Sequence, residues 1–238
     1  MAPKPRGGTI VDFVGLPGAG KTTLVHAVAE RMNVYGIAAA VGENGGGTTV
    51  EGRPLRGWAG RVFGVAALVG NPGLTAACGA LVVGGRHASL TPMFVNLCRR
   101  DRALRRSRPR DLLLLHESSF HRLCIALALT GHTSPRTIER FVRRMAWPDA
   151  LVVLEVGPAT AAERVRRRLM RIDPALAAID ASAPMIEGWR ERYAAVAEGV
   201  AAVVEPTIPV LRLDGSTNDV AALAARVRAW WAAHGAGT

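Results

Sequence analysis

Residues 9–23 read TIVDFVGLPGAGKTT, and this stretch decides the fold. Thr9–Val14 is a short apolar run rich in β-branched residues, as expected of a buried parallel strand. Gly15–Thr22 matches the spacing G-x-x-x-x-G-K-[ST] of a phosphate loop. Across Thr22–Tyr35 the apolar residues recur at helical spacing, and Gly36 favours a helix stop. A strand, a glycine-rich loop and a helix in this order predict a nucleotide-binding α/β domain.

The chemistry of this loop favours a nucleoside triphosphate, with ATP and Mg²⁺ as the expected ligands. Its glycines let backbone amides point at phosphate oxygens, and the helix adds its positive dipole end. Lys21 is expected to reach the β- and γ-phosphates, and the Thr22 hydroxyl is expected to bind Mg²⁺. The residues predicted to bind the nucleotide are Gly15, Pro17, Gly18, Ala19, Gly20, Lys21, Thr22 and Thr23. Apart from Lys4, Lys21 is the only lysine in the chain, which argues against a chance match to the motif.

The rest of the chain alternates between apolar runs and helical patterns. Further strands are predicted at Ile37–Val41, Asp111–His116, Ala150–Val156 and Ile208–Leu213. Helices are predicted from Ser134-Pro135 to about Ala146, before Pro148, and at Ala159–Met170, Ala183–Val204 and Asn218–His234. This alternation predicts right-handed crossovers and one parallel sheet with helices on both faces. We expect a single domain over residues 1–238.

Charge and cysteine content restrict the partners. The net charge of +11 suits an anionic ligand, but no nucleic-acid-binding motif and few aromatic residues accompany it. A nucleic-acid partner is therefore not expected, and a small anionic substrate accounts for a basic cleft. The cysteines Cys78, Cys98 and Cys124 form no metal-binding or disulfide pattern. The N-terminal apolar run is too short for a secretion signal, so we expect a cytoplasmic protein.

An uncharged segment lies between Arg61 and Arg86. Its length raises the question of a membrane span, but Asn71-Pro72-Gly73 interrupts it. We therefore predict two buried helices in this segment; membrane contact or an apolar substrate pocket is the alternative. A dense basic run follows at Arg99–Arg108, which is interpreted as a solvated helix. A dock for a phosphorylated substrate or for anionic lipid headgroups stays open as well.

Several segments resemble the thymidylate kinase and deoxynucleoside kinase group of phosphate-loop kinases. They are GLPGAGKTT at residues 15–23, ENGGGT at 43–48, LEVGPATAAERVRRR at 154–168 and LRLDGSTNDVAALAARV at 211–227. The resemblance covers roughly residues 9–50 and 110–235. It implies the three-layer fold of P-loop NTPases, with a five-stranded parallel sheet in the order 2-3-1-4-5. Residues 52–108 lie outside the resemblance and are expected to form a helical insert.

The resemblance also implies roles for two carboxylates. Glu43 follows the second strand and would address the acceptor, either by taking its proton or by orienting it. Glu117 follows the third strand and would hold Mg²⁺ together with Thr22. Ser118 stands where the group has an arginine, and Arg122 lies one helical turn further on as a candidate replacement.

Basic residues after the fourth strand complete the expected site. Arg164 and Arg168 share one helix face and are predicted to close over the phosphates as a lid; a solvated basic helix is the alternative. His116 and His121 are expected to be strand-end and helix residues rather than catalysts.

Together these features predict an ATP-dependent kinase whose catalytic residues are Lys21, Glu43, Glu117, Arg164 and Arg168. The acceptor would be a small molecule: a nucleoside, a nucleotide or another hydroxyl compound. Gly42 and Ser118 replace two arginines of the resembled group, which points away from thymidylate as the acceptor. Three alternatives stay open: a nucleotide-binding switch, a slow ATPase with a protein or membrane partner, and a degenerate kinase serving as a peripheral membrane adaptor. Homodimer formation also stays open.

Overall fold

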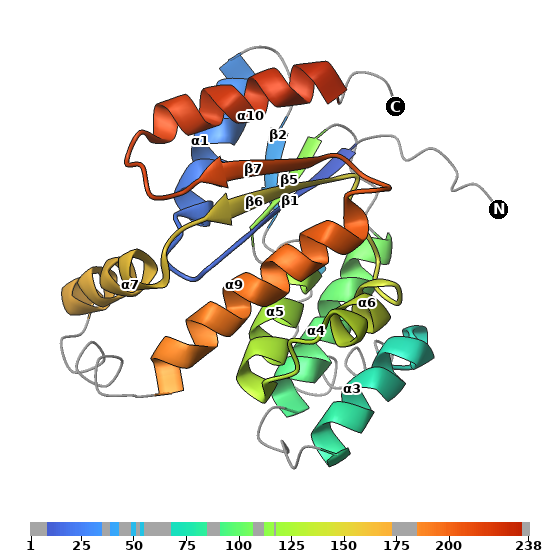
Figure 1. Cartoon of the computed structure of the whole chain (residues 1–238). Helices are drawn as coiled ribbons and strands as arrows, with labels where there is room; N and C mark the ends of the chain where they lie inside the picture. Colours follow the sequence, from blue (N-terminus) through green and yellow to red (C-terminus); the bar gives the residue numbers. More distant parts are fainter. Residues whose placement is uncertain are drawn as a thin grey trace.

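The fold is a parallel β-sheet with helices on both faces (Figure 1). It is seen in a computed structural model that describes residues 9–34, 39–42, 49–50, 53–54, 68–84, 91–106, 112–116, 118–172 and 185–234. The prediction of an α/β fold with a parallel sheet is confirmed.

The sheet contains five strands in the order β2-β5-β1-β6-β7, and all neighbours pair in parallel. The strands are β1 (Thr9–Gly15), β2 (Ala39–Gly42), β5 (Leu112–Leu115), β6 (Ala150–Glu155) and β7 (Val210–Asp214). Counted in chain order within this sheet, the order is 2-3-1-4-5. Because β1 is central, the loop that follows it leaves the middle of the carboxyl edge, where open α/β sheets bind ligands. A second, antiparallel pair, β3 (Thr49–Val50) with β4 (Arg53–Pro54), was not predicted from the sequence.

Helices form a layer on each side of the sheet. On one side, α1 (Lys21–Val34) packs against α10 (Val220–His234). On the other, α5 (Ser119–Thr130) lies beside α9 (Met185–Val204), with α4 (Thr91–Arg106) and α6 (Pro135–Val142) outside them. Helix α7 (Pro158–Ile172) follows β6 at the carboxyl edge of the sheet, and α3 (Pro72–Gly84) lies at the periphery against α4.

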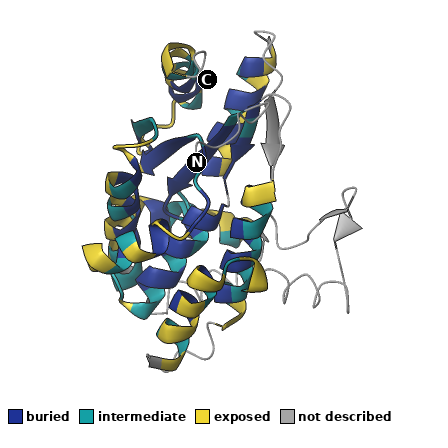
Figure 2. Ribbon diagram, turned by 90° about the vertical axis from the view of Figure 1, so that its right-hand side faces the viewer, coloured by how far each residue is buried: buried dark blue, intermediate teal, exposed yellow. Residues whose placement is uncertain are grey.

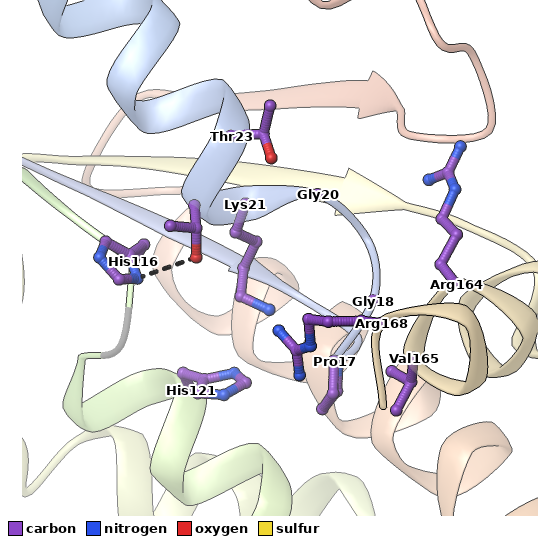
Figure 3. Close-up of a pocket in the computed structure, with 11 residues that line it drawn as sticks. Pro17, Gly18, Gly20, Lys21, Thr23, His116, His121, Arg164, Val165 and Arg168 are labelled. Carbon is purple, nitrogen blue, oxygen red and sulfur yellow. Dashed lines mark hydrogen bonds between the residues drawn. The ribbon is translucent and has the colours of Figure 1, made fainter. Parts of the chain in front are cut away.

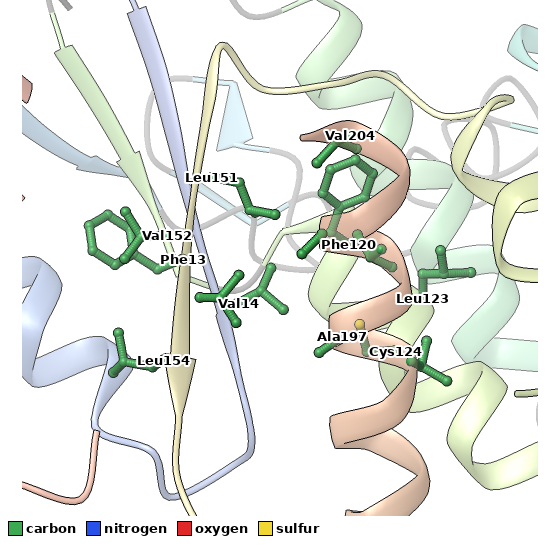
Figure 4. Close-up of a cluster of buried hydrophobic side chains, with 14 of the residues drawn as sticks. Phe13, Val14, Phe120, Leu123, Cys124, Leu151, Val152, Leu154, Ala197 and Val204 are labelled. Atoms are coloured by element: carbon green, nitrogen blue, oxygen red, sulfur yellow. The ribbon is translucent and has the colours of Figure 1, made fainter. Parts of the chain in front are cut away.

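Strand β1 forms because it supplies both faces of the sheet with apolar side chains. Phe13 points toward the side of α1, whereas Val14 points toward α5 and α9 (Figure 4). Both side chains are fully buried, and each contributes roughly 1.5–3 kcal/mol to the free energy of folding. Figure 2 shows the same pattern over the whole molecule, with buried strands and helices that expose only their outer faces. The two-sided core therefore holds the start of the phosphate loop in a rigid position.

The uncharged segment contains the predicted break between helices, but its helices are not fully buried. Residues 68–70 are helical and Asn71 is not, so the helix is interrupted here as predicted. Pro72 and Gly73 begin helix α3, and the Asn71 side chain caps it by accepting from the Leu74 amide at 3.1 Å. One face of α3 is buried, but Val83 on its other face is 81% exposed. The predicted burial is therefore correct for one face only. No helix within the described residues combines the length and apolar character needed to cross a membrane.

Local sequence signals predicted the start of α6 correctly but not its end. Ser134 caps this helix and Pro135 is its first residue, as predicted. The predicted end near Ala146 is wrong, since α6 ends at Val142. The amides of Arg144 and Met145 bond three positions back instead of four, so the chain leaves the helix in tight turns. The amide of Ala146 then donates to the buried carboxylate of Asp101 in α4 at 2.5 Å.

Candidate functional site

The phosphate loop runs from Leu16 to Gly20, between β1 and α1. Gly18 and Gly20 have φ angles of 92° and 94°, a region that L side chains rarely adopt. At Gly18 there is a second reason for glycine, because a Cβ atom would collide with the Ala161 carbonyl oxygen of α7. At Gly15 it would lie only 2.7 Å from the Leu154 carbonyl oxygen. The glycines therefore serve both the curvature of the loop and its close packing against β6 and α7.

Lys21 is the first residue of α1, and its side chain is buried inside the loop. Its ammonium group donates to the carbonyl oxygens of Gly15 at 2.6 Å and Leu16 at 3.0 Å. These two contacts fix the direction of a flexible side chain. The positive charge consequently lies beside the helix N-terminus, where an anion would also be attracted by the helix dipole.

The loop opens into a pocket of about 300 Å³ (Figure 3). Four parts of the chain line it: the loop itself, the first three residues of α1, the histidines His116 and His121, and the α7 residues Arg164, Val165 and Arg168. Among these lining residues three carry a full positive charge and none is acidic. This pocket is suited to a polyanion such as a triphosphate.

The two arginines of the predicted lid behave differently. Arg164 donates to the carbonyl oxygens of Gly215 at 2.6 Å and Ser216 at 3.0 Å, and to the Asn218 side chain at 3.3 Å. Its guanidinium group points away from Lys21, toward the loop after β7 (Figure 3). The guanidinium group of Arg168 instead extends toward Pro17 and Lys21. Only Arg168 directs its charge over the phosphate loop.

The structure describes one of the two residues predicted to bind Mg²⁺, namely Thr22. The Thr22 hydroxyl lines the pocket, and its Oγ1 lies 3.5 Å from His116 Nδ1 at the end of β5. Glu117, the second predicted ligand, lies outside the described residues, as does Glu43. No group of three His, Cys, Asp or Glu side chains within the described ranges is placed to hold a metal ion. Of the two residues predicted to bind Mg²⁺, the described pocket therefore contains Thr22.

Arg122, the candidate replacement for an arginine at position 118, is not among the residues that line the described pocket. It lies one turn into α5, where its amide donates to the Ser118 carbonyl oxygen at 3.2 Å, and it is not a lining residue. Ser118 is the N-cap of α5, and its side chain accepts from the His121 amide at 3.3 Å. The residue that stands in place of the arginine therefore stabilises the start of a helix.

The histidines lie where the sequence predicted, His116 at the end of β5 and His121 in α5, and both face the pocket. His116 and His121 both line the pocket, and His121 Nδ1 lies 2.6 Å from the hydroxyl of Tyr193 in α9. Burial lowers the pKa of His121 well below its usual value, and the nearby charges of Lys21 and Arg122 lower it further. His121 is therefore a neutral ring at pH 7. Its position just after a strand on the carboxyl edge was a signal that sequence reasoning underrated.

A buried carboxylate beneath the loop was also missed. Asp12 of β1 is 1% exposed, and burial raises its pKa from 3.8 to about 7. Ser118, the Phe13 backbone, Lys21 and Arg100 oppose this rise, in decreasing order of effect. The sequence shows a charged residue inside an apolar run, but it does not show which side chains surround that residue in the folded protein.

Comparisons with known proteins support the fold. No protein-family model and no curated protein matches the sequence. The structure is similar to deoxyadenosine kinase from M. mycoides with bound dATP, with a TM-score of 0.54 and 12% identity over 94% of this chain and 99% of that chain. The same kinase with bound dCTP gives a TM-score of 0.52 and 12% identity, over 93% and 99% of the two chains.

This likeness extends beyond the parts of the sequence that resemble kinases, because it covers 94% of the chain. At 12% identity it concerns the fold and not the substrate. The chain thus has the fold of this deoxyadenosine kinase.

Proposed function

We propose that this protein is an ATP-dependent phosphotransferase that moves the γ-phosphoryl group to a hydroxyl or phosphate group of a small molecule. The observation that carries the proposal is the position of Lys21. The carbonyl oxygens of Gly15 and Leu16 hold its ammonium group in a pocket whose described lining contains no acidic residue. Phosphoryl transfer needs little covalent chemistry from the protein, so positioning and charge supply most of the catalysis. The pocket offers both.

Each residue of the site has a proposed part. The loop amides and Lys21 bind the phosphates of the donor. Thr22 and Glu117 hold Mg²⁺, which when bound neutralises charge on the phosphate oxygens. Glu43 orients the acceptor or takes its proton, as the sequence resemblance implies.

The lid is proposed to act through Arg168. This guanidinium extends over the loop and stabilises charge that develops during transfer. Arg164 keeps its place in the lid as a positioning residue, because its three acceptors anchor α7 to the loop after β7.

We propose a nucleoside, a nucleotide or a related hydroxyl compound as acceptor, and the cytoplasm as the place of the reaction. The fold shared with deoxyadenosine kinases supports a nucleoside. Gly42 and Ser118, in place of arginines of the resembled group, support an acceptor other than thymidylate.

A phosphoryl-transfer screen tests the proposal. Purified protein is incubated with Mg·ATP and a panel of nucleosides, nucleoside monophosphates, sugars and aminoglycosides, and both ADP release and product mass are measured. The gain of one phosphoryl group by any acceptor supports the proposal and identifies the acceptor class. ATP hydrolysis that depends on Lys21 but yields no phosphorylated product contradicts it. That result would favour a switch or a slow ATPase with a protein or membrane partner.

A further inference from the structure

A buried hydrogen-bonded pair connects α9 to the wall of the pocket. His121 lies in the first turn of α5 and is 5% exposed, and Tyr193 in α9 is fully buried. Their side chains meet at 2.6 Å between His121 Nδ1 and the Tyr193 hydroxyl, and the rings cross edge to face at 5.7 Å. Two elements that are 72 positions apart therefore fix the orientation of one imidazole ring.

The surroundings of Tyr193 determine which nitrogen of His121 carries the proton. Burial raises the pKa of Tyr193 well above its usual value, and the neighbouring Cys124 thiol raises it further, so the phenol is neutral. Of the two neutral groups, the phenol is the stronger hydrogen-bond donor and the imidazole nitrogen is the stronger acceptor, so the phenol hydrogen is directed to His121 Nδ1. A neutral imidazole that accepts at Nδ1 carries its hydrogen at Nε2.

The free edge of the ring faces the space where phosphates would lie. His121 extends from α5 toward the gap between the Lys21 ammonium and the Arg168 guanidinium (Figure 3). Its Nε2 has no hydrogen-bond partner within the part of the chain that the structure describes. Because His121 lines the pocket, Nε2–H is a donor available to a ligand acceptor there.

We propose that His121 is a substrate-contacting residue that donates from Nε2–H to an oxygen of the transferred phosphoryl group, and that Tyr193 is the positioning residue that fixes its tautomer. This inference rests on the proposed function, since it assumes that a γ-phosphoryl group lies beside Lys21. A neutral donor adds a hydrogen bond to two cations without adding charge.

Paired substitutions separate this role from a structural one. Glutamine places its amide nitrogen near the position of Nε2, whereas asparagine mimics Nδ1 and lacks the donor at the pocket. We expect His121→Gln to keep kcat within about 10-fold of wild type, and His121→Asn to lower it about 100-fold, with the KM for ATP nearly unchanged in both. Tyr193→Phe should lower kcat about 10-fold, because the ring still packs but the tautomer is no longer fixed. Equal losses in the glutamine and asparagine variants would overturn the proposal.

A second measurement stands apart from turnover. Proton–nitrogen correlation NMR of wild-type protein should show His121 protonated at Nε2, and Tyr193→Phe should show a mixture of tautomers. Addition of Mg·ATP should shift the Nε2–H signal, whereas Mg·ADP, which has no γ-phosphoryl group, should leave it nearly in place. An Nδ1-protonated ring, or equal shifts with both nucleotides, would contradict the inference. If no acceptor is phosphorylated in the screen but ATP alone shifts the signal, the proposed transfer fails while the phosphoryl contact of His121 stands.

Discussion

Arg164 of α7 donates to the Gly215 carbonyl oxygen at 2.6 Å, and so joins the predicted lid to the loop between β7 and α10. Arg168, one helical turn later, has no such anchor within the described chain and extends over the phosphate loop. The two arginines share a helix face but have different partners. Substitutions should therefore separate anchoring from charge stabilisation.

Arg168→Ala should lower kcat roughly 10- to 100-fold, because a charge over the transferring phosphoryl group is lost. Its melting temperature should match wild type, since the side chain is exposed and makes no hydrogen bond in the described structure. Arg164→Ala should instead lower the free energy of unfolding by about 1–2 kcal/mol. Arg166→Ala is the matched control, because Arg166 bonds Glu163 on the outer side of α7. Loss of activity in the control as large as in Arg168→Ala would refute a specific lid role.

Gly18→Ala should weaken ATP binding and destabilise the loop. The φ angle of 92° alone imposes a strain of roughly 1–3 kcal/mol on any other residue, and the new methyl group would also displace α7 at Ala161. Gly131→Ala provides a control, because Gly131 has φ 74° at the end of α5 but open space around it. The control should lose about 1 kcal/mol of stability and bind ATP normally. Calorimetric ATP titration and thermal unfolding of both variants decide between a binding and a purely structural role.

Asp12→Asn should stabilise the protein increasingly as pH rises. The pKa of Asp12 is raised to about 7 in the folded protein, so the folded state keeps a proton that the unfolded chain loses above 3.8. Stability contributed by this group is therefore complete at low pH and falls as pH rises toward 7. The advantage of the asparagine variant should grow by about 1.4 kcal/mol per pH unit between pH 5 and about 7, then level off.

Asp214→Asn serves as the control for this pH dependence. The hydrogen bonds from Ser216 lower the pKa of Asp214, so this carboxylate stays ionised from pH 5 to 8. Its effect on the free energy of unfolding should stay constant over that range. A pH-independent difference for Asp12→Asn, measured by chemical denaturation, would show that Asp12 is ionised in the folded state.

Glu43→Gln should lower turnover while leaving the affinity for ATP nearly unchanged, because this carboxylate is assigned to the acceptor. Two separate measurements check the assignment: kcat with the acceptor identified in the screen, and the dissociation constant for ATP. An equal loss of ATP binding would place Glu43 at the donor instead.

The phosphate loop was predictable because its signals are local. The glycine spacing, the β-branched run before it and the helical pattern after it all lie within residues 9–35. The alternation of strand and helix predicted a parallel sheet in the same way. These local features need no knowledge of distant contacts. The order of the strands was implied only by the resemblance to phosphate-loop kinases.

The walls of the pocket depend on contacts that no local pattern records. His121 meets Tyr193 across 72 positions, and Ser118, far along the chain, lowers the pKa of Asp12. Helical spacing predicted that Arg164 and Arg168 share a face, but Arg164 turns to acceptors 51 positions away. Tertiary packing decided each of these orientations.

The central claim is that Lys21 holds the donor phosphates for transfer. The most direct measurement uses ATP with an isotope-labelled γ-phosphoryl group, the acceptor found in the screen, and mass spectrometry of the product. Wild-type protein and the Arg166→Ala control should transfer the labelled group intact, and Lys21→Ala should reduce the rate by at least about 100-fold without unfolding. Full activity of Lys21→Ala, or a product without the label, would contradict the account.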